Sequence, residues 1–113
     1  MPTWRERPGV AVLDNKIYVT GGVWYGQIMS SVDCYDPDTN TWSQVVNMNL
    51  ARNCHGLVSL LGRLYAIGGS SDVECIEVYD PDNNTWTLLQ YKLDGKVGYT
   101  GGDSIIKMVI LDI

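Results

Sequence analysis

The residues that could carry chemistry in this sequence are few and scattered. His55 is the single histidine, and the three cysteines, Cys34, Cys54 and Cys75, form no C-x-x-C pair. Neighbouring side chains on a strand point to opposite faces, so Cys54 and His55 could pair only at a special turn. One histidine and three separated cysteines do not make a metal site. We therefore predict no catalytic centre, no cofactor and no bound metal, and we interpret His55 as a polar residue at the start of a strand.

Two pairs of carboxylates, Asp36 with Asp38 and Asp80 with Asp82, each flank a proline. Paired acids can serve as general acid and general base. Asp followed by Pro is also typical of the first positions of a type I turn, in which the Asp side chain accepts from the backbone and Pro presets φ. We interpret both pairs as turns and favour a non-enzymatic function.

A further group of side chains has the composition of a protein-recognition surface, with arginines, aromatic residues and small polar residues. The candidate partner-binding residues are Arg5, Arg7, Trp24, Tyr25, Gln27, Arg52, Asn53, Ser70 and Ser71. The arginines predict an acidic peptide segment in the partner and binding that weakens as salt rises. The alternative is that Arg5 and Arg52 only brace adjacent sheets.

A tandem repeat positions these residues. Gly68-Gly69 lies 47 positions after Gly21-Gly22, and VYDPDNNTW (Val78 to Trp86) lies 44 positions after CYDPDTNTW (Cys34 to Trp42). Each copy contains four short runs rich in β-branched and aromatic residues, bounded by turn residues. The predicted strands are 9–13, 17–20, 31–35 and 41–45 in the first copy, and 56–60, 63–67, 75–79 and 85–89 in the second. Residues 23–30 are predicted to form a longer loop.

Gly-Gly, Tyr-Asp-Pro and Trp, in that order within about 45 residues, are typical of a propeller with four strands per blade. The sequence resembles the kelch repeat from Met1 to about Leu89. The expected fold is all-β, a partial kelch β-propeller with two four-stranded antiparallel blades at 1–47 and 48–90. The aromatic residues of the repeat are expected to pack between blades: Tyr18, Tyr35, Trp42, Tyr65, Tyr79 and Trp86.

Residues 91–113 are expected to form a truncated third repeat. LDGKVGYTGG (Leu93 to Gly102) matches LDNKIYVTGG (Leu13 to Gly22), although the 47-residue spacing would put its glycine pair near position 115. The alternative is unrelated sequence whose glycines match by chance. Because propellers close with about four to eight blades, we expect the chain to be a fragment of a longer protein, a short isoform or one part of a larger assembly. Met1-Pro2 falls where such repeats carry an internal Met-Pro, which favours an internal methionine of a longer chain.

In such a blade, the segment before the first strand and the loop after the second emerge on the same side, here called the loop face. All the candidate partner-binding residues fall there. The repeats resemble those of kelch-like adaptors, in which a BTB domain contacts a cullin and the propeller captures a substrate for ubiquitylation. By that resemblance Arg5, Arg52, Tyr25, Ser70 and Ser71 occupy positions that meet the partner, and cullin contact would need a BTB domain outside these residues. The alternative is a cytoskeletal kelch protein that binds actin.

Composition narrows the remaining choices. With 113 residues and 45% apolar content, the chain suits one small packed domain. No stretch reaches the roughly 20 apolar residues of a membrane-spanning helix, and a net charge of −5 provides no basic field for nucleic acid. Three cysteines cannot all pair within one chain, which favours reduced thiols and a cytoplasmic location.

Overall fold

The computed structural model describes residues 5–70 and 75–90, and the expected third repeat at 91–113 lies outside the described residues. The described part of the chain consists of strands and connecting turns, without a helix. The strands are β1 Gly9–Leu13, β2 Lys16–Thr20, β3 Val23–Trp24, β4 Gln27–Ile28, β5 Val32–Asp36, β6 Thr41–Val45, β7 Gly56–Leu60, β8 Arg63–Ile67, β9 Cys75–Asp80 and β10 Thr85–Gln90.

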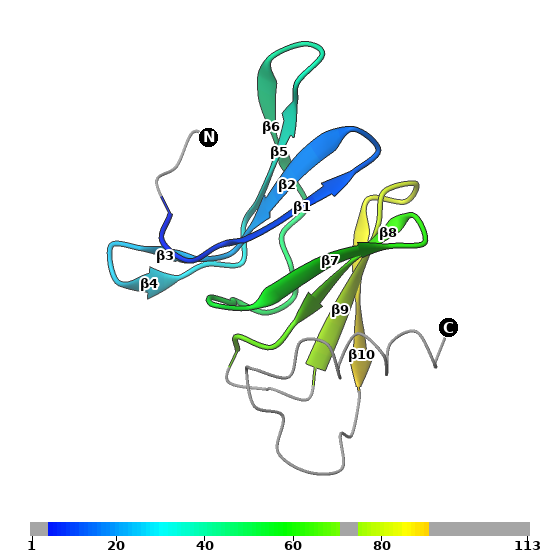
Figure 1. The fold of residues 1–113 in the computed structure, drawn as a ribbon. Helices are drawn as coiled ribbons and strands as arrows, with labels where there is room; N and C mark the ends of the chain where they lie inside the picture. The colour runs from blue at the N-terminus through cyan, green and yellow to red at the C-terminus, as the bar shows by residue number, and fades with distance from the viewer. Residues whose placement is uncertain (1–4, 71–74, 91–113) are drawn as a thin grey trace.

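Eight of these strands form two antiparallel sheets of four, in the orders β1-β2-β5-β6 and β7-β8-β9-β10. We call them blade 1 and blade 2. Their first strands, β1 and β7, lie next to each other, and the sheets spread apart from this shared inner edge (Figure 1). The expected all-β fold with neighbouring four-stranded blades is therefore confirmed, and the eight predicted strands agree with the observed bounds to within one residue.

The turns follow the predicted chemistry. Asp38 N donates to Asp36 Oδ1 over 3.0 Å, and Asn40 adopts a left-handed φ of 53° before β6 begins. Blade 2 repeats this pattern at Asp82 and Asp80, again with an N–H to carboxylate distance of 3.0 Å. The carboxylates of Asp36 and Asp80 thus serve as turn acceptors, and Asp38 and Asp82 contribute their backbone N–H groups to the same turns.

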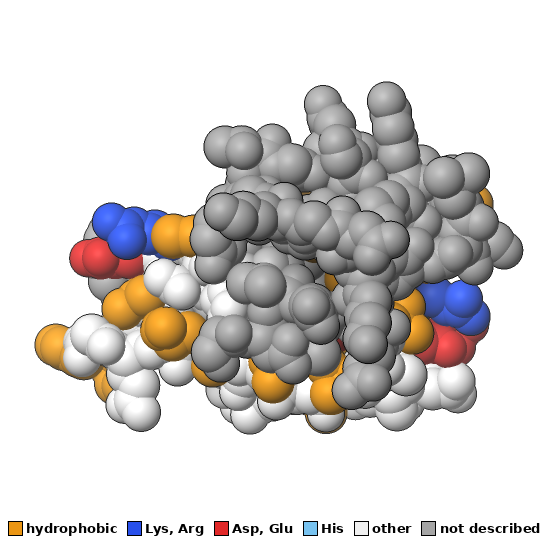
Figure 2. Space-filling model, turned by 90° about the horizontal axis from the view of Figure 1, so that it is seen from below, with side chains coloured by type: hydrophobic (Ala, Val, Ile, Leu, Met, Phe, Trp, Pro, Cys, Tyr) orange, Lys and Arg blue, Asp and Glu red, His pale blue; other side chains and the backbone are white. Residues whose placement is uncertain are grey.

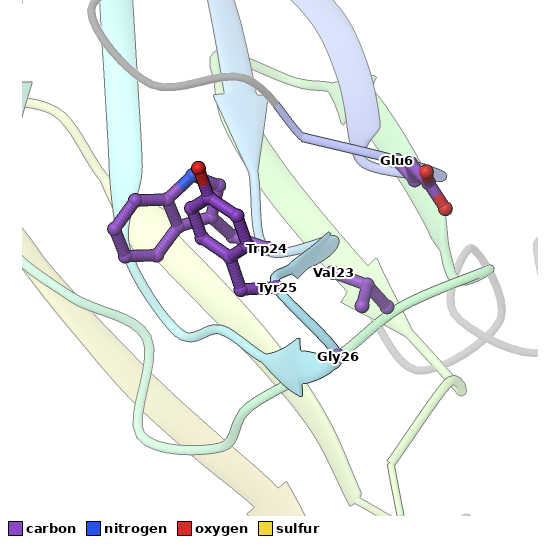
Figure 3. A pocket seen from close by; sticks show the side chains of 5 residues that line it. All are labelled: Glu6, Val23, Trp24, Tyr25 and Gly26. Atoms are coloured by element: carbon purple, nitrogen blue, oxygen red, sulfur yellow. The ribbon is translucent and has the colours of Figure 1, made fainter.

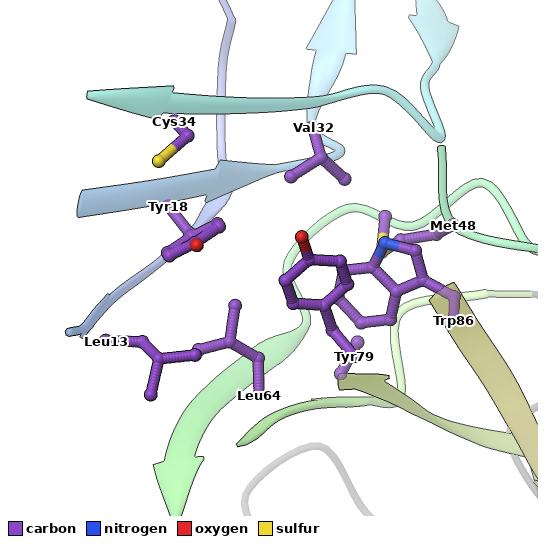
Figure 4. Packing of buried hydrophobic residues seen from close by; sticks show 9 residues of the cluster. Leu13, Tyr18, Val32, Cys34, Met48, Leu64, Tyr79 and Trp86 are labelled. Atoms are coloured by element: carbon purple, nitrogen blue, oxygen red, sulfur yellow. The ribbon is translucent and has the colours of Figure 1, made fainter. Parts of the chain in front are cut away.

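The core lies between the blades. Tyr18 of β2 packs on Tyr79 of β9 with ring centroids 5.7 Å apart, and Tyr79 packs on Trp86 of β10 at 5.1 Å (Figure 4). Burial raises the pKa of both tyrosine hydroxyls above their usual range. The buried cluster joins both blades and consists of Leu13, Tyr18, Val32, Cys34, Met48, Leu64, Ala66, Tyr79 and Trp86.

The repeat aromatics are buried on both faces of the blade 2 sheet, but on only one face of the blade 1 sheet. Tyr18, Tyr65, Tyr79 and Trp86 are buried, the second of them in a separate cluster of blade 2. Tyr35 is half-buried and Trp42 is 37% exposed, so the prediction that these two pack between blades is wrong for the described structure. β1 likewise leaves Val10 and Val12 exposed, because the described part of the chain places no sheet against that face of blade 1.

Candidate functional site

The loop predicted at 23–30 contains a small hairpin that the sequence analysis missed. β3 pairs with β4 through Val23 opposite Ile28 and Trp24 opposite Gln27. Tyr25 and Gly26 form the tip, with φ of 49° and 74°, which is the pattern of a two-residue type I′ turn. The hairpin projects from the loop face, away from the Asp-Pro turns (Figure 1). The signal was Gly26 at the second turn position, after the apolar pair Val23-Trp24 and before Gln27-Ile28.

Backbone hydrogen bonds hold the base of this hairpin to both blades. Glu6 and Val23 exchange two N–H to carbonyl bonds of 2.9 and 2.8 Å, which ties the segment before β1 to β3. Gly22 N donates to Arg52 O over 2.7 Å, and Arg52 N donates to Met29 O over 3.1 Å, which ties the hairpin to blade 2. The hairpin is therefore a fixed projection of the two-blade unit, with its backbone set before any partner arrives.

The tip presents aromatic surface to solvent. Tyr25 is 90% exposed and Trp24 is 43% exposed, and their rings meet edge to face with centroids 4.8 Å apart. An open cavity of about 460 Å³ lies against the hairpin and is lined by Glu6, Val23, Trp24, Tyr25 and Gly26. In Figure 3 the rings of Trp24 and Tyr25 lie together on one side of the hairpin, and the side chains of Val23 and Glu6 lie on the other side and point away from the rings.

Arg5 lies in the interior of blade 1, and only 6% of it is exposed. Its guanidinium donates to Asp33 Oδ2 over 2.5 Å and to the carbonyl oxygens of Gly21 and Ser31 over 3.0 and 2.8 Å. Arg5 thus joins the segment before β1 to β5 and to the glycine turn.

Arg52 has the same role in blade 2 and is fully buried. Its Nε donates to Glu77 Oε2 over 3.2 Å, and its guanidinium also donates to Gly68 O over 2.9 Å. Glu77 additionally accepts from the backbone N–H groups of Asn49 and Leu50 over 2.5 and 2.9 Å. The two arginines therefore have the bracing role that the sequence left open, but the guanidinium partners described above lie within each arginine's own blade and not across the two blades.

This placement corrects the predicted partner-binding set. Arg5 and Arg52 have no side-chain surface available to a partner, because each is buried against a carboxylate of its own blade. Asp33 and Glu77 were missed, although they are carboxylates at equivalent repeat positions inside mostly apolar strands, and that is the signal that could have found them. The loop face consequently loses two of its three expected positive charges.

The remaining predicted residues are distributed as follows. Arg7, Trp24, Tyr25 and Gln27 are exposed, with the last three on the hairpin. Asn53 and Ser70 are half-buried near the glycine turn of blade 2, and Ser71 lies outside the described residues. Figure 2, viewed from below Figure 1, shows basic, acidic and hydrophobic side chains close together at the left, the end at which Figure 1 draws the hairpin.

His55 has a structural position that the sequence did not reveal. Its Nε2 shares a hydrogen bond of 2.7 Å with Thr20 Oγ1 of blade 1, so the pair links the two blades. A Cβ at Gly9 would lie 2.6 Å from the same nitrogen, so only glycine leaves room for this contact. Burial, with a smaller contribution from the charge of Arg52, lowers the pKa of His55 to about 4. The ring is neutral at physiological pH and packs as part of the blade interface.

The remaining predictions concern chemistry and membranes. Among the residues that the structure describes, no three His, Cys, Asp or Glu side chains gather as ligands for a metal ion. Over the same residues, no helix has the length and apolar character needed to span a bilayer.

Comparison with known proteins agrees with this architecture. The family described as Kelch motif matches residues 5–49 and 51–91. Kelch-like protein 28 of Homo sapiens is 45% identical over 69 residues, which cover 54% of this chain and 12% of that protein. Kelch repeat and BTB domain-containing protein 13 of Homo sapiens is 43% identical over 63 residues, covering 54% of this chain and 14% of that protein. This chain thus matches only a small part of the length of either relative.

A solved structure has the same fold. The structure of YjhT superposes with a TM-score of 0.70 at 18% sequence identity, over 78% of this chain and 38% of that one. The described blades therefore correspond to a part of a larger propeller of known structure.

Proposed function

The chain belongs to the kelch motif family, a family of non-enzymatic interaction scaffolds, and we propose that it binds a protein partner through the β3–β4 hairpin of its loop face. The observation that carries this proposal is the exposed Trp24–Tyr25 pair at the tip of a hairpin whose base is bonded to both blades. Exposed aromatic side chains on a rigid backbone are favourable interface anchors, since little conformational entropy is lost when they are covered.

The partner context that we propose is substrate recognition for a cullin-RING ubiquitin ligase. Support comes from the relatives, which are kelch-like proteins and a protein named for both kelch repeats and a BTB domain. In this proposal the blades capture the substrate, and a BTB domain in the longer protein contacts the cullin. We further propose a cytoplasmic location, because the thiols of Cys34 and Cys54 are both free.

The structure weakens the argument, made from the sequence, that the partner segment is acidic. An acidic partner segment was predicted from three arginines, and Arg7 is the one of these three that is exposed. Its neighbour Glu6 is also exposed and carries the opposite charge. The electrostatic support for an acidic partner is therefore small, and the proposal rests on the aromatic hairpin.

The test compares partner capture by the wild-type chain and by two hairpin variants, Trp24→Ala and Tyr25→Ala. Trp42→Ala is the matched control, because Trp42 is similarly exposed but follows the Asp-Pro turn on the opposite side of blade 1. If the hairpin anchors the partner, both variants lower the captured amount about tenfold or more, and the control leaves it unchanged.

The same proteins also separate the two functional contexts. A captured protein whose ubiquitylation in cells falls when Tyr25→Ala is introduced into the longer protein supports the adaptor proposal. Cosedimentation of the chain with filamentous actin, reduced by the same substitution, would support the cytoskeletal alternative instead. Equal capture by wild type and both hairpin variants would remove the hairpin from the binding surface.

A further inference from the structure

The β3–β4 hairpin has two edges, and one of them already carries an added strand residue. Val23 N donates to Glu6 O over 2.8 Å, and Glu6 N donates to Val23 O over 2.9 Å. Glu6 thus forms an isolated antiparallel bridge on the β3 edge. Because β4 pairs with β3 from the other side, it forms the opposite edge of this small sheet (Figure 1).

The hairpin register directs the backbone groups of Ile28 outward from the β4 edge. Val23 and Ile28 lie directly opposite each other. Such antiparallel pairs alternate between residues that exchange two hydrogen bonds and residues that direct both groups away from each other. Val23 uses both of its groups on Glu6, so its pair with Ile28 is of the second kind. The next pair agrees, because Met29 N donates to Gly22 O over 2.9 Å. The N–H and the carbonyl of Ile28 therefore point away from β3.

The β4 edge is accessible and lacks the usual protection against strand pairing. Ile28 is 46% exposed, and Gln27 is exposed as well. Within the described part of the chain, no backbone hydrogen bond outside the strand ladders involves Ile28. Natural edge strands discourage pairing with charged residues or proline, and the segment YGQIMSS at 25–31 contains neither. An open, uncharged edge of this kind can accept an extended segment of another protein.

We propose that the protein partner adds an extended segment to the β4 edge, in an antiparallel bridge at Ile28 that mirrors the bridge of Glu6 at Val23. The inference deepens the proposed function and rests on it, since it states the conformation in which the hairpin holds the partner. Side chains alternate along an extended segment. The partner residue opposite Ile28 lies on the side of Val23, and its two neighbours lie on the side of Trp24 (Figure 3).

This mode of binding also states which partner chemistry matters. The residue opposite Ile28 is expected to be valine or isoleucine, because β-branched side chains suit strands and stabilise cross-strand pairs. Main-chain hydrogen bonds supply the affinity, so the charge of the segment has little influence. Binding should therefore change little with salt, in contrast to the salt dependence predicted from the sequence for an acidic segment.

The first measurement needs no ligand. In the full chain, amide hydrogen exchange corrected for intrinsic rates should be about tenfold or more faster at Ile28 than at Val23, because the Val23 amide alone of these two is hydrogen-bonded. Equal protection of the two amides would mean that the Ile28 group is already paired, and it would overturn the proposal.

The second measurement uses two peptides as probes. One is acetyl-Ser-Thr-Val-Thr-Ser-amide, and the other is the same peptide N-methylated at its three central residues, which keeps the side chains and removes their N–H donors. In NMR titrations of the full chain, the unmethylated peptide should shift the Ile28 amide signal in a saturable manner, equally at low and high salt, and the methylated peptide should not. The indole N–H of Trp42 is the internal reference. Equal shifts with both peptides, or no shift with either, would overturn the proposal.

A backbone variant makes the assignment specific. Ile28→Pro removes a donor that the hairpin does not use, at an edge position where proline is tolerated. It should raise the Kd of the unmethylated peptide about fivefold or more, as read from the Gln27 and Met29 amides. Ile28→Val is the matched control, because it keeps the N–H and the β-branched side chain, and it should change the Kd by less than about twofold. A Kd for Ile28→Pro equal to that of the wild type would contradict the proposal.

The partner itself separates this inference from the proposed function. If Trp24→Ala and Tyr25→Ala lower partner capture and Ile28→Pro does not, the proposed function stands and this inference alone is wrong. If all three variants leave capture unchanged, both are wrong. An unchanged Val23 amide signal in Ile28→Pro shows that the hairpin is intact, and the two peptides test the wild-type edge independently of any substitution.

Discussion

Blade 1 and blade 2 place the same aromatic pair in two different environments. Tyr35 and Trp42 lie with ring centroids 5.0 Å apart at an interplanar angle of 45°, and the equivalent Tyr79 and Trp86 lie 5.1 Å apart at 40°. Trp42 is 37% exposed, whereas Trp86 is 8% exposed. The local geometry thus follows from the repeat, and the burial follows from whether a neighbouring sheet covers that face.

The buried ion pairs show a second difference between the blades. In blade 2, Glu77 accepts from Arg52 and from two backbone N–H groups. In blade 1, Asp33 Oδ2 accepts from Arg5, but Asp33 Oδ1 has no hydrogen-bond partner in the described part of the chain. Asp33 has a side chain one methylene shorter than that of Glu77, so its carboxylate extends less far from the strand. In the repeat, the residue equivalent to the donor Asn49 is Pro2, and proline has no backbone N–H to donate. Equivalent repeat positions can therefore differ in how completely a buried charge is satisfied.

The largest expected effect on stability comes from removing Glu77, the carboxylate with more hydrogen bonds. Glu77→Ala should lower the free energy of unfolding by about 4 kcal/mol, because it leaves Arg52 buried without its counter-charge and two backbone donors without an acceptor. Asp33→Ala should cost less, since Asp33 has fewer hydrogen bonds to lose. Urea denaturation of both variants measures the difference. A larger loss for Asp33→Ala would contradict the ranking of the two blades.

The aromatic pair gives the next effect. Trp86→Ala should lower the free energy of unfolding by about 3 to 4 kcal/mol, because it opens a cavity in the inter-blade cluster and removes the 3.0 Å hydrogen bond from Trp86 Nε1 to Val46 O. Trp42→Ala should change it by less than about 1 kcal/mol, since its ring is partly in solvent. Similar losses in the two variants would mean that the exposed face of blade 1 is covered in solution.

The third prediction concerns pH and the interface between the blades. The folded pKa of His55, about 4, lies below the unfolded value of 6.5, so the unfolded chain binds a proton more readily between these values. The contribution of His55 to stability is complete above pH 6.5 and is lost as pH falls toward 4, by up to about 3 kcal/mol. His55→Gln removes this titration. The free energy of unfolding of the wild type should therefore fall toward that of the variant as pH is lowered from 6.5 to 4. A constant difference from pH 7 to pH 4 would contradict it.

The smallest expected effect is at the Asp-Pro turns. Asn84 has a φ of 52°, and its Oδ1 accepts from the hydroxyl of Tyr79 over 2.9 Å in a half-buried contact. Asn84→Ala should cost about 1 to 2 kcal/mol, and Asn40→Ala, at the exposed counterpart, about 1 kcal/mol or less. Asn84→Gly is the control, because glycine restores the left-handed backbone and leaves the hydrogen-bond loss to be measured by thermal unfolding.

The strands and turns could be predicted because their signals are local. Alternation of apolar residues, the glycine pairs and the Asp-Pro turns recur in both copies, and each acts within a few residues of chain. The resemblance to the kelch repeat is confirmed for the same reason, since its motif residues are the ones that shape each sheet. The β3–β4 hairpin was missed because its strands of two residues are too short for a periodic pattern.

The candidate site was harder to predict than the fold. Trp24, Tyr25 and Gln27 were chosen correctly as exposed loop-face residues, because a loop between two strands is solvated by default. Arg5 and Arg52 were chosen on the same ground and are buried. The sequence near an arginine does not show whether its side chain faces solvent or a distant carboxylate. Here the carboxylates lie 25 residues after Arg52 and 28 residues after Arg5.

By itself, the sequence determined the two four-stranded units, their turns and the aromatic pair that each carries, because these features depend on neighbours along the chain and across one ladder. Only the tertiary structure decided which arginines are neutralised, which face of each blade is covered and where Glu6 meets the hairpin. Those outcomes depend on contacts between segments far apart in the chain, and the same side chain can be a brace or a binding residue according to what packs against it.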